Sequence, residues 1–122
     1  MITMSATERV MYLNKPWGHE EILCSNNYLF KRLFMQEGKR CSLQHHDDKQ
    51  ETVYILTGKL RVIIETAGFI IIEEKILLPN DWLTILPKTI HRMEAIEDTY
   101  YLEASTPHPD DVIRHKDDYN RI

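Results

Sequence analysis

The sequence is poor in cysteine and contains no long apolar run and no run of basic residues. Its 122 residues include only two cysteines, Cys24 and Cys41, which form no CxxC pair, so free thiols in a reducing compartment are expected. The most apolar stretch, residues 69–72, ends at Glu73 and Glu74, far short of a membrane span. The N-terminus lacks an apolar core long enough for a signal peptide. A cytoplasmic protein without membrane association is therefore expected.

The balance of charges argues against nucleic acid as a partner. The formal net charge is −4, and the basic residues are scattered along the chain. Hydrophobic residues make up 43% of the chain and charged residues 28%, which are ordinary values for a globular protein. A chain of this length can bury one core without disulfides. The sequence therefore predicts a single domain over residues 1–122, with a leading segment at 1–14 and a C-terminal tail at 106–122.

Most of the chain consists of short β-branched and aromatic runs separated by turn residues. Strands are predicted at residues 20–24, 28–36, 40–46, 51–57, 59–65, 69–77, 82–85, 91–95 and 99–105. Many short strands at nearly regular spacing predict an all-β sandwich or barrel, in which a ligand can sit between two sheets. Only residues 110–119, in the tail, could form a helical turn.

Two of the predicted strands are apolar on both faces. Residues 54–56 and 60–64 show this pattern instead of alternating apolar and polar positions. A strand that is buried on both sides packs against a second layer or a second subunit. A homodimer is therefore expected.

The polar stretch from residue 38 to residue 51, GKRCSLQHHDDKQE, contains the candidate site. Side chains alternate along a strand, so Gln44 and His46 share one face and His45 points to the other. Glu51 begins the next strand after a four-residue turn, and a hairpin would bring it beside His46. His91 opens a later strand and is the best candidate for a fourth ligand.

These side chains suit a divalent metal ion. Neutral imidazole, carboxylate and amide oxygen are ligands of zinc, our first choice, and also of manganese, iron or nickel. One carboxylate among neutral ligands leaves the site positively charged, so the ion remains a good Lewis acid. Asp47, Asp48 and Lys49 are interpreted as a solvated turn. His91 taken alone would more often be a structural or surface histidine than a ligand.

The intervals in this stretch resemble the first motif of the cupin superfamily. That motif contains a glycine, a ligand, a histidine, a glutamate and a second glycine at fixed spacing. The intervals match at Gly38, Gln44, His46, Glu51 and Gly58. The second motif is weaker, because most of its glycine and proline positions are replaced, although the interval to its histidine fits. The resemblance implies an all-β cupin jelly roll, a double-stranded β-helix, with metal ligands Gln44, His46, Glu51 and His91.

Within the cupins, the chain resembles phosphomannose isomerases, particularly the C-terminal cupin of the bifunctional type II enzymes. "CSLQHHDDKQE" is similar to their "SLQ-x-H…E" segment, in which glutamine serves with histidine, glutamate and a later histidine around the metal. Further similar pieces occur in order as "KPWG", "HRME" and "DDVIR…DDYNR", so the resemblance extends over nearly the whole chain after residue 14. Asp47, Asp48 and Lys49 stand where that family has two histidines and an arginine, so substrate preference could differ. The resemblance implies a stand-alone cupin.

This resemblance implies a metal-dependent aldose–ketose isomerase acting on a sugar phosphate, similar to mannose-6-phosphate isomerase. The phosphate would need cations. Candidates for binding it are Lys31, Arg32, Arg92 and Arg114. Lys31 and Arg32 are adjacent in a strand, so only one of them can face the pocket. The catalytic base is not assigned, and an exposed acid such as Glu94 is one option.

Two alternatives to the isomerase remain open. One is a non-catalytic cupin that binds a sugar or sugar nucleotide and partners a polysaccharide-pathway enzyme. The other is a different cupin enzyme, such as an iron dioxygenase. Fold and metal site alone do not decide among these functions.

Overall fold

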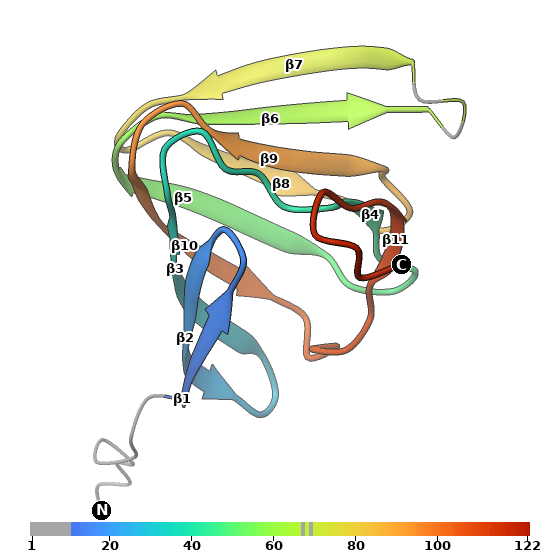
Figure 1. The fold of residues 1–122 in the computed structure, drawn as a ribbon. Coiled ribbons are helices and arrows are strands. Elements are labelled where there is room, and N and C mark those ends of the chain that lie inside the picture. Colours follow the sequence, from blue (N-terminus) through green and yellow to red (C-terminus); the bar gives the residue numbers. More distant parts are fainter. Residues whose placement is uncertain (1–10, 67, 69) are drawn as a thin grey trace, which may run out of the picture.

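The computed structural model describes residues 11–66, 68 and 70–122, which form two antiparallel β-sheets packed face to face (Figure 1). The six-stranded sheet contains, in spatial order, β1 (Met11–Lys15), β2 (Gly18–Ser25), β3 (Leu29–Met35), β10 (Thr99–Ser105), β5 (Glu51–Thr57) and β8 (Trp82–Ile85). The five-stranded sheet contains β11 (Ile113–Lys116), β4 (Leu43–His45), β9 (His91–Ala95), β6 (Leu60–Glu65) and β7 (Ile71–Leu77). The predicted all-β class is confirmed. The described residues include no helix long and apolar enough to cross a membrane.

Several strands begin and end where the sequence predicts. The bounds of β5, β8, β9 and β10 match the predicted ranges to the residue. These strands alternate between the interior and the outside, as in β10, where Thr99, Tyr101, Glu103 and Ser105 are buried and the residues between them are more exposed. Alternation therefore placed charged as well as apolar residues on the inner face.

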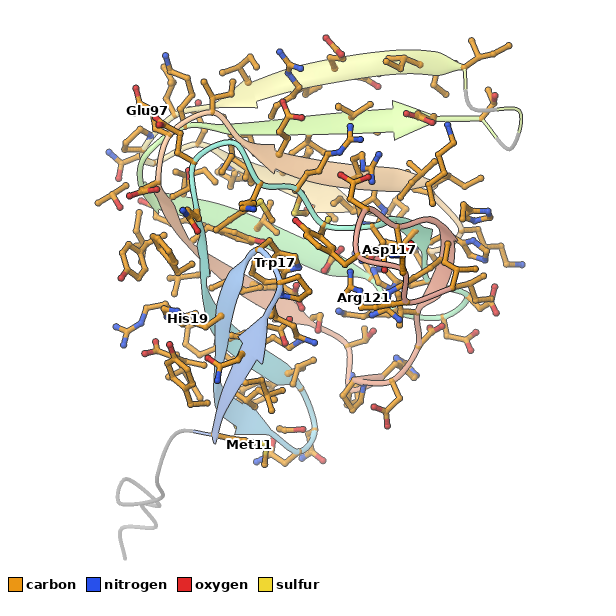
Figure 2. The ribbon with its side chains drawn as sticks, in the orientation of Figure 1. Met11, Trp17, His19, Glu97, Asp117 and Arg121 are labelled. Carbon is orange, nitrogen blue, oxygen red and sulfur yellow. The ribbon has the colours of Figure 1, made fainter. Side chains whose placement is uncertain are left out.

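The hydrophobic core lies between the two sheets. The six-stranded sheet contributes Leu33, Met35, Val53, Ile55, Ile85 and Tyr101, and the five-stranded sheet contributes Leu60, Val62, Leu77, Met93 and Ala95. Trp17, in the β1–β2 turn, joins this cluster and is labelled near the centre of Figure 2. The core therefore fills only part of the space between the sheets, and polar side chains occupy the rest.

The two glycines of the matched motif lie in tight turns with positive φ. Gly38 has φ of 79° and Gly58 has φ of 95°, a region that side-chain-bearing residues rarely adopt. A Cβ at position 58 would also lie 2.2 Å from the backbone oxygen of Asp98. The glycine spacing in the sequence therefore reflects two turns of the backbone that frame β4 and β5.

Two expectations, about the tail and β4, need correction, and the structure adds a strand near the N-terminal end. Residues 110–119 form no helical turn, because Ile113–Lys116 is a strand that pairs with β4. The strand predicted at 40–46 is regular only over Leu43–His45, and Arg40 makes an isolated bridge to Glu94. The end of the leading segment belongs to β1, which pairs with β2, and its residues 1–10 lie outside the described part. For the tail and β4, pairing with a distant strand decided the local structure, whereas β1 pairs with the next strand in a hairpin.

Candidate functional site

Three buried side chains, His46, Glu51 and His91, converge between the sheets. Their exposed fractions are 4%, 3% and 1%, and one potential ligand atom from each lies within 4.8 Å of the other two. His46 directly follows β4 and His91 begins β9, which neighbours β4 in the five-stranded sheet. Glu51 begins β5 in the opposite sheet. The cluster therefore joins the two sheets.

The route that brings Glu51 to His46 differs from the predicted hairpin. β4 and β5 lie in different sheets, so the turn between them crosses from one sheet to the other. His46 Nε2 still lies 3.3 Å from Glu51 Oε1, and His91 Nε2 lies 3.2 Å from the same oxygen. The predicted proximity is therefore achieved across the interior and not along a ladder of paired strands.

The backbone orients both imidazole rings. His46 Nδ1 lies 2.5 Å from the carbonyl oxygen of Asp111, and His91 Nδ1 lies 2.8 Å from that of Thr89. Each Nδ1 must donate a proton to its carbonyl, which leaves Nε2 of a neutral ring with a bare lone pair. Among the described residues, neither Nε2 makes a hydrogen bond.

This arrangement fits a metal ion. Two lone pairs and an anionic oxygen that face one another in a buried space repel unless positive charge lies between them. Ring tethers to backbone carbonyls are also the usual support of metal-binding histidines. Burial lowers the pKa of His46, but the neighbouring Glu51 carboxylate and the Asp111 carbonyl together raise it by more, so the net pKa lies above its usual value. The site thus stabilises a positive charge next to the two Nε2 atoms, and a divalent cation would supply that charge.

Glu51 carries its negative charge despite complete burial. Burial alone would raise the pKa of Glu51, but His46, His91 and the Lys49 ammonium together lower it well below its usual range. Lys49 Nζ lies 3.5 Å from Glu51 Oε2 and 3.0 Å from Glu103 Oε2. Burial and the Glu51 charge raise the pKa of Glu103 to about 7. Glu51 is thus anionic, and Glu103 exchanges a proton near neutral pH.

Lys49 was wrongly assigned to a solvated turn. Asp47 and Asp48 are exposed as expected, but Lys49 is only 5% exposed and lies between two carboxylates. Sequence reasoning therefore missed Lys49 and Glu103 as members of the site. Two signals could have found them. Lys49 and Glu51 are two residues apart, so alternation puts them on one face. Glu103 lies in the same way two residues from Tyr101, a buried apolar residue of β10.

Gln44 and Arg114 face the cavity from the five-stranded sheet. In the register of this sheet, Arg114 pairs with Gln44, and Gln44 pairs with His91. Directly paired residues project to the same face, so these three side chains form one row. The Gln44 amide oxygen accepts a hydrogen bond of 2.6 Å from Ser42 and keeps a second lone pair. Arg114 Nε is buried and makes no hydrogen bond to the described residues.

Of the other predicted phosphate ligands, only Lys31 faces the cavity. Lys31 is buried and lines it, whereas Arg32 lies on the outer face of the sheet and pairs with Glu21. Arg92 also points away, since its neighbours His91 and Met93 are the cavity-lining residues of β9. Arg92 Nε donates instead to the carbonyl oxygen of Cys41, 3.1 Å away. Arg32 and Arg92 are therefore not brought to the site.

The acid suggested as a possible base is also elsewhere. Glu94 lies on the outer face of β9, where its carboxylate is 3.3 Å from Arg61. His45 points away from the cluster as predicted, and its Nδ1 lies 2.7 Å from His115 Nε2. The alternation of side chains along a strand therefore places the two adjacent histidines on opposite faces, and it places Glu94 outside the cluster.

The cluster lies in a cavity of about 420 Å³, which is within the range of small-molecule sites. Beyond the histidines, the cavity is lined by a second charged group, in which Glu20 lies between two lysines. Lys31 Nζ is 3.3 Å from Glu20 Oε1, and Lys15 Nζ is 3.9 Å from Glu20 Oε2. Glu103, which is paired with Lys31 in the β3–β10 register, lies next to this group. The two ammonium groups are the cations that this end of the cavity offers to an anionic group of a ligand.

The C-terminal tail secures the turn that carries His46. The Asp111 carboxylate accepts hydrogen bonds from the backbone N–H groups of Asp47, Asp48 and Lys49, at 3.0, 2.8 and 2.9 Å. Farther along, Asp117 and Arg121 form a two-pronged ion pair at 2.8 and 2.9 Å, and they lie side by side in Figure 2. The tail is thus part of the site's support.

We expect Asp111→Asn to destabilise the metal-free protein at pH 7, because the amide has one acceptor oxygen and carries no charge. The hydrogen bonds from Asp48, Asp47 and Lys49 hold the pKa of Asp111 at about 2, below its value in an unfolded chain. The stabilisation is therefore present above roughly pH 4 and lost as the pH falls towards 2. Urea unfolding of both proteins between pH 2 and pH 7 checks this.

Asp110→Asn is the matched control, since Asp110 is the exposed neighbour in the sequence. It should leave the unfolding free energy nearly unchanged. If the difference in stability between the wild type and Asp111→Asn stayed constant down to pH 2, that result would contradict the role given to the Asp111 carboxylate.

Comparison with known families gives one match that spans almost the whole chain. The family described as the mannose-6-phosphate isomerase C-terminal domain matches residues 4–117. No curated protein matches at the required significance. The match covers His46, Glu51 and His91, Glu20 with its two lysines, and Asp111 with the turn that it holds.

Solved structures establish the fold. The capsular polysaccharide assembling protein CapF from Staphylococcus aureus superposes with a TM-score of 0.77 at 12% identity, over 90% of this chain and 32% of that one. KdgF from Halomonas sp. superposes with a TM-score of 0.68 at 18% identity, over 82% and 88%. Oxalate decarboxylase from Bacillus subtilis superposes with a TM-score of 0.74 at 15% identity, over 86% and 30%.

The matches to CapF and oxalate decarboxylase cover only about a third of those longer chains. At these identities the similarity describes the fold alone. It confirms the predicted cupin jelly roll.

Proposed function

Since the chain belongs to the family of mannose-6-phosphate isomerase C-terminal domains, we propose that it is a metal-dependent cupin acting on a sugar phosphate as an aldose–ketose isomerase. The observation that carries the proposal is the meeting of two imidazole Nε2 atoms with one carboxylate oxygen inside a closely lined cavity. Mannose 6-phosphate is the first substrate to test.

In the proposed site, His46, Glu51 and His91 hold one divalent ion, and Gln44 adds its amide oxygen. Zinc is the first choice for this donor set, with manganese, iron or nickel as alternatives. The ion supplies a Lewis acid beside the sugar oxygens. The Lys49 ammonium contacts the second carboxylate oxygen of Glu51, Oε2, so that Oε1 stays directed towards the two imidazole rings.

The phosphate is proposed to bind between Lys31 and Arg114, which face the cavity from opposite sheets. Lys31 shares Glu20 with Lys15, so an arriving phosphate meets two ammonium groups and one carboxylate. Arg114 offers a guanidinium whose Nε has no hydrogen bond among the described residues. Charge-assisted hydrogen bonds from such groups are the strong ones that fix a phosphate.

One set of measurements tests the proposal. Elemental analysis of the purified protein identifies the metal, and a coupled assay follows conversion of mannose 6-phosphate to fructose 6-phosphate with and without chelator. We expect turnover that chelator abolishes and added metal restores. His46→Ala should lose it, whereas His45→Ala, the neighbouring residue that points away, should retain it because His45 does not line the cavity.

Two outcomes would overturn the isomerase, and a third would overturn the assigned site. Tight binding of sugar phosphate without turnover would favour a non-catalytic binding cupin. Consumption of oxygen by the metal-loaded protein would favour an oxygenase. Turnover that persists in His46→Ala would remove the proposed site from the chemistry.

A further inference from the structure

β7 is an edge strand that the other described residues leave uncovered. It is the outermost strand of the five-stranded sheet (Figure 1), and of its seven residues only Leu77 is buried. Its neighbour β6 is largely buried or half-buried. Five large aliphatic side chains in or beside β7 are between 45% and 66% exposed: Ile70, Ile71, Ile72, Ile76 and Leu78. Such an edge displays backbone hydrogen-bonding groups next to apolar side chains, which favours pairing with another strand.

The charges at the centre of β7 specify which strand it can pair with. Reading from Ile72 to Ile76, the order is apolar, Glu73, Glu74, Lys75, apolar. In an antiparallel pair of two identical strands centred on Glu74, Glu73 lies opposite the partner's Lys75, and Lys75 lies opposite the partner's Glu73. One step farther out, Ile72 lies opposite the partner's Ile76. The segment is therefore complementary to itself in this register.

We propose that β7 pairs edge to edge with β7 of a second copy of this chain, about a two-fold axis through Glu74. The symmetry allows this register, because directly opposite residues must point to the same face and a central residue opposite itself satisfies that condition. The two sheets join into one continuous sheet of ten strands. In the β6–β7 pairing Ile64 lies opposite Glu73 and Glu65 lies opposite Ile71, so Ile72 is a bulge and the regular segment of β7 begins at Glu73. The regular contact therefore spans residues 73–75, and Ile72 and Ile76 flank it.

The ion pair seen within one chain is consistent with this pairing. Glu73 and Lys75 lie on the same face of β7, with their charged atoms 3.6 Å apart and both side chains about half exposed. Two such pairs facing each other across the axis form a four-charge cluster of alternating sign. Glu74 instead faces the partner's Glu74, and like charges directly opposite weaken a strand pair. The dimer is therefore reversible and strengthens when this repulsion is removed.

Of the two strands from which sequence reasoning inferred a dimer, β6 is buried within one copy, because Val62 and Ile63, on its opposite faces, are both at most 5% exposed. In β5, Ile55 is fully buried, but Leu56, on the other face, is 38% exposed. The two-sided apolar pattern of β6 therefore needs no second subunit. Next to it, β7 carries exposed apolar residues.

Charge reversal tests the pairing. By sedimentation velocity over a range of concentrations, Glu73→Lys and Lys75→Glu alone should each weaken the dimer at least about tenfold, since each places like charges opposite one another twice. The double variant Glu73→Lys/Lys75→Glu should restore it. Glu74→Gln should tighten it. Circular dichroism of each variant checks that the fold is retained.

A cross-link tests the register. In a Cys24→Ser background, Glu74→Cys should form an intermolecular disulfide under mild oxidation, because residues opposite on paired strands have Cα atoms about 4.5–5.5 Å apart. Lys75→Cys is the matched control. Its two copies would lie diagonally, about 8 Å apart, beyond the reach of a disulfide.

A protein that stays monomeric at every concentration would overturn the proposal. So would a dimer that ignores the β7 charges but is broken by Trp82→Lys, since exposed Trp82 lies on the six-stranded sheet. Efficient cross-linking through Lys75→Cys would overturn the register.

Discussion

Glu51→Gln is expected to lower the affinity for the divalent metal by at least about a hundredfold. The amide keeps the size of the side chain but removes the only anion among the proposed ligands. Loss of an outer hydrogen-bonding partner already costs roughly tenfold to a hundredfold in metal affinity, and loss of a charged ligand should cost more. Isothermal titration with zinc and metal analysis after dialysis measure the effect.

Glu94→Gln is the control for this substitution. Glu94 is a half-buried glutamate on β9, close to His91 in the sequence, but it faces outwards and pairs with Arg61. We expect it to leave metal affinity within about twofold, because exposed ion pairs contribute little. Equal losses in the two variants would mean that Glu51 acts through general stability and is not a ligand.

Lys49→Met is expected to destabilise the protein by about 3–5 kcal/mol, although methionine fits the same space. The substitution leaves Glu51 and Glu103 facing each other without the ammonium that lies 3.5 and 3.0 Å from their oxygens. Breaking a buried ion pair by removing one partner typically costs this much, because the remaining charge is left uncompensated. Urea unfolding measures the loss.

The pH dependence of that loss identifies its cause. Glu103 has a pKa of about 7 in the wild type, where Lys49 lowers it. Without Lys49 the pKa of Glu103 is higher, so Glu103 takes up a proton more readily and relieves part of the repulsion. The destabilisation by Lys49→Met should therefore be smaller at pH 6 than at pH 8. Lys39→Met, at an exposed position, is the control and should change stability by less than about 0.5 kcal/mol. A loss below about 1 kcal/mol for Lys49→Met would show that the ammonium is dispensable.

Sequence reasoning located the strands and most of the site because both follow from alternation. Four strands match to the residue, parity alone separated His46 from His45, and parity allowed only one of Lys31 and Arg32 to face the cavity. The spacing of the motif then indicated which later strand brings His91 to the same place. These inferences need only the local period of the chain and the interval between turns.

Two of the features that sequence reasoning missed depend on contacts between distant segments. The tail reads as a possible helical turn, yet β4 offers it a free edge, and Ile113–Lys116 pairs there. Lys49 lies among acidic turn residues, and its burial depends on Glu103, which is far away in the sequence. Arg92 and Glu94 differ, because both have the opposite parity to His91 in the same strand, so alternation alone could have excluded them.

The candidate ligands come from both sheets, with His46 and His91 on one side and Glu51 on the other. A bound ion would therefore cross-link the two sheets, which packing and the connections between strands also join. Its binding energy would oppose any separation of the layers, and each tenfold excess of free metal over the dissociation constant would add about 1.4 kcal/mol to the folded state. The concentration of available metal would then determine both the stability of the protein against unfolding and its activity.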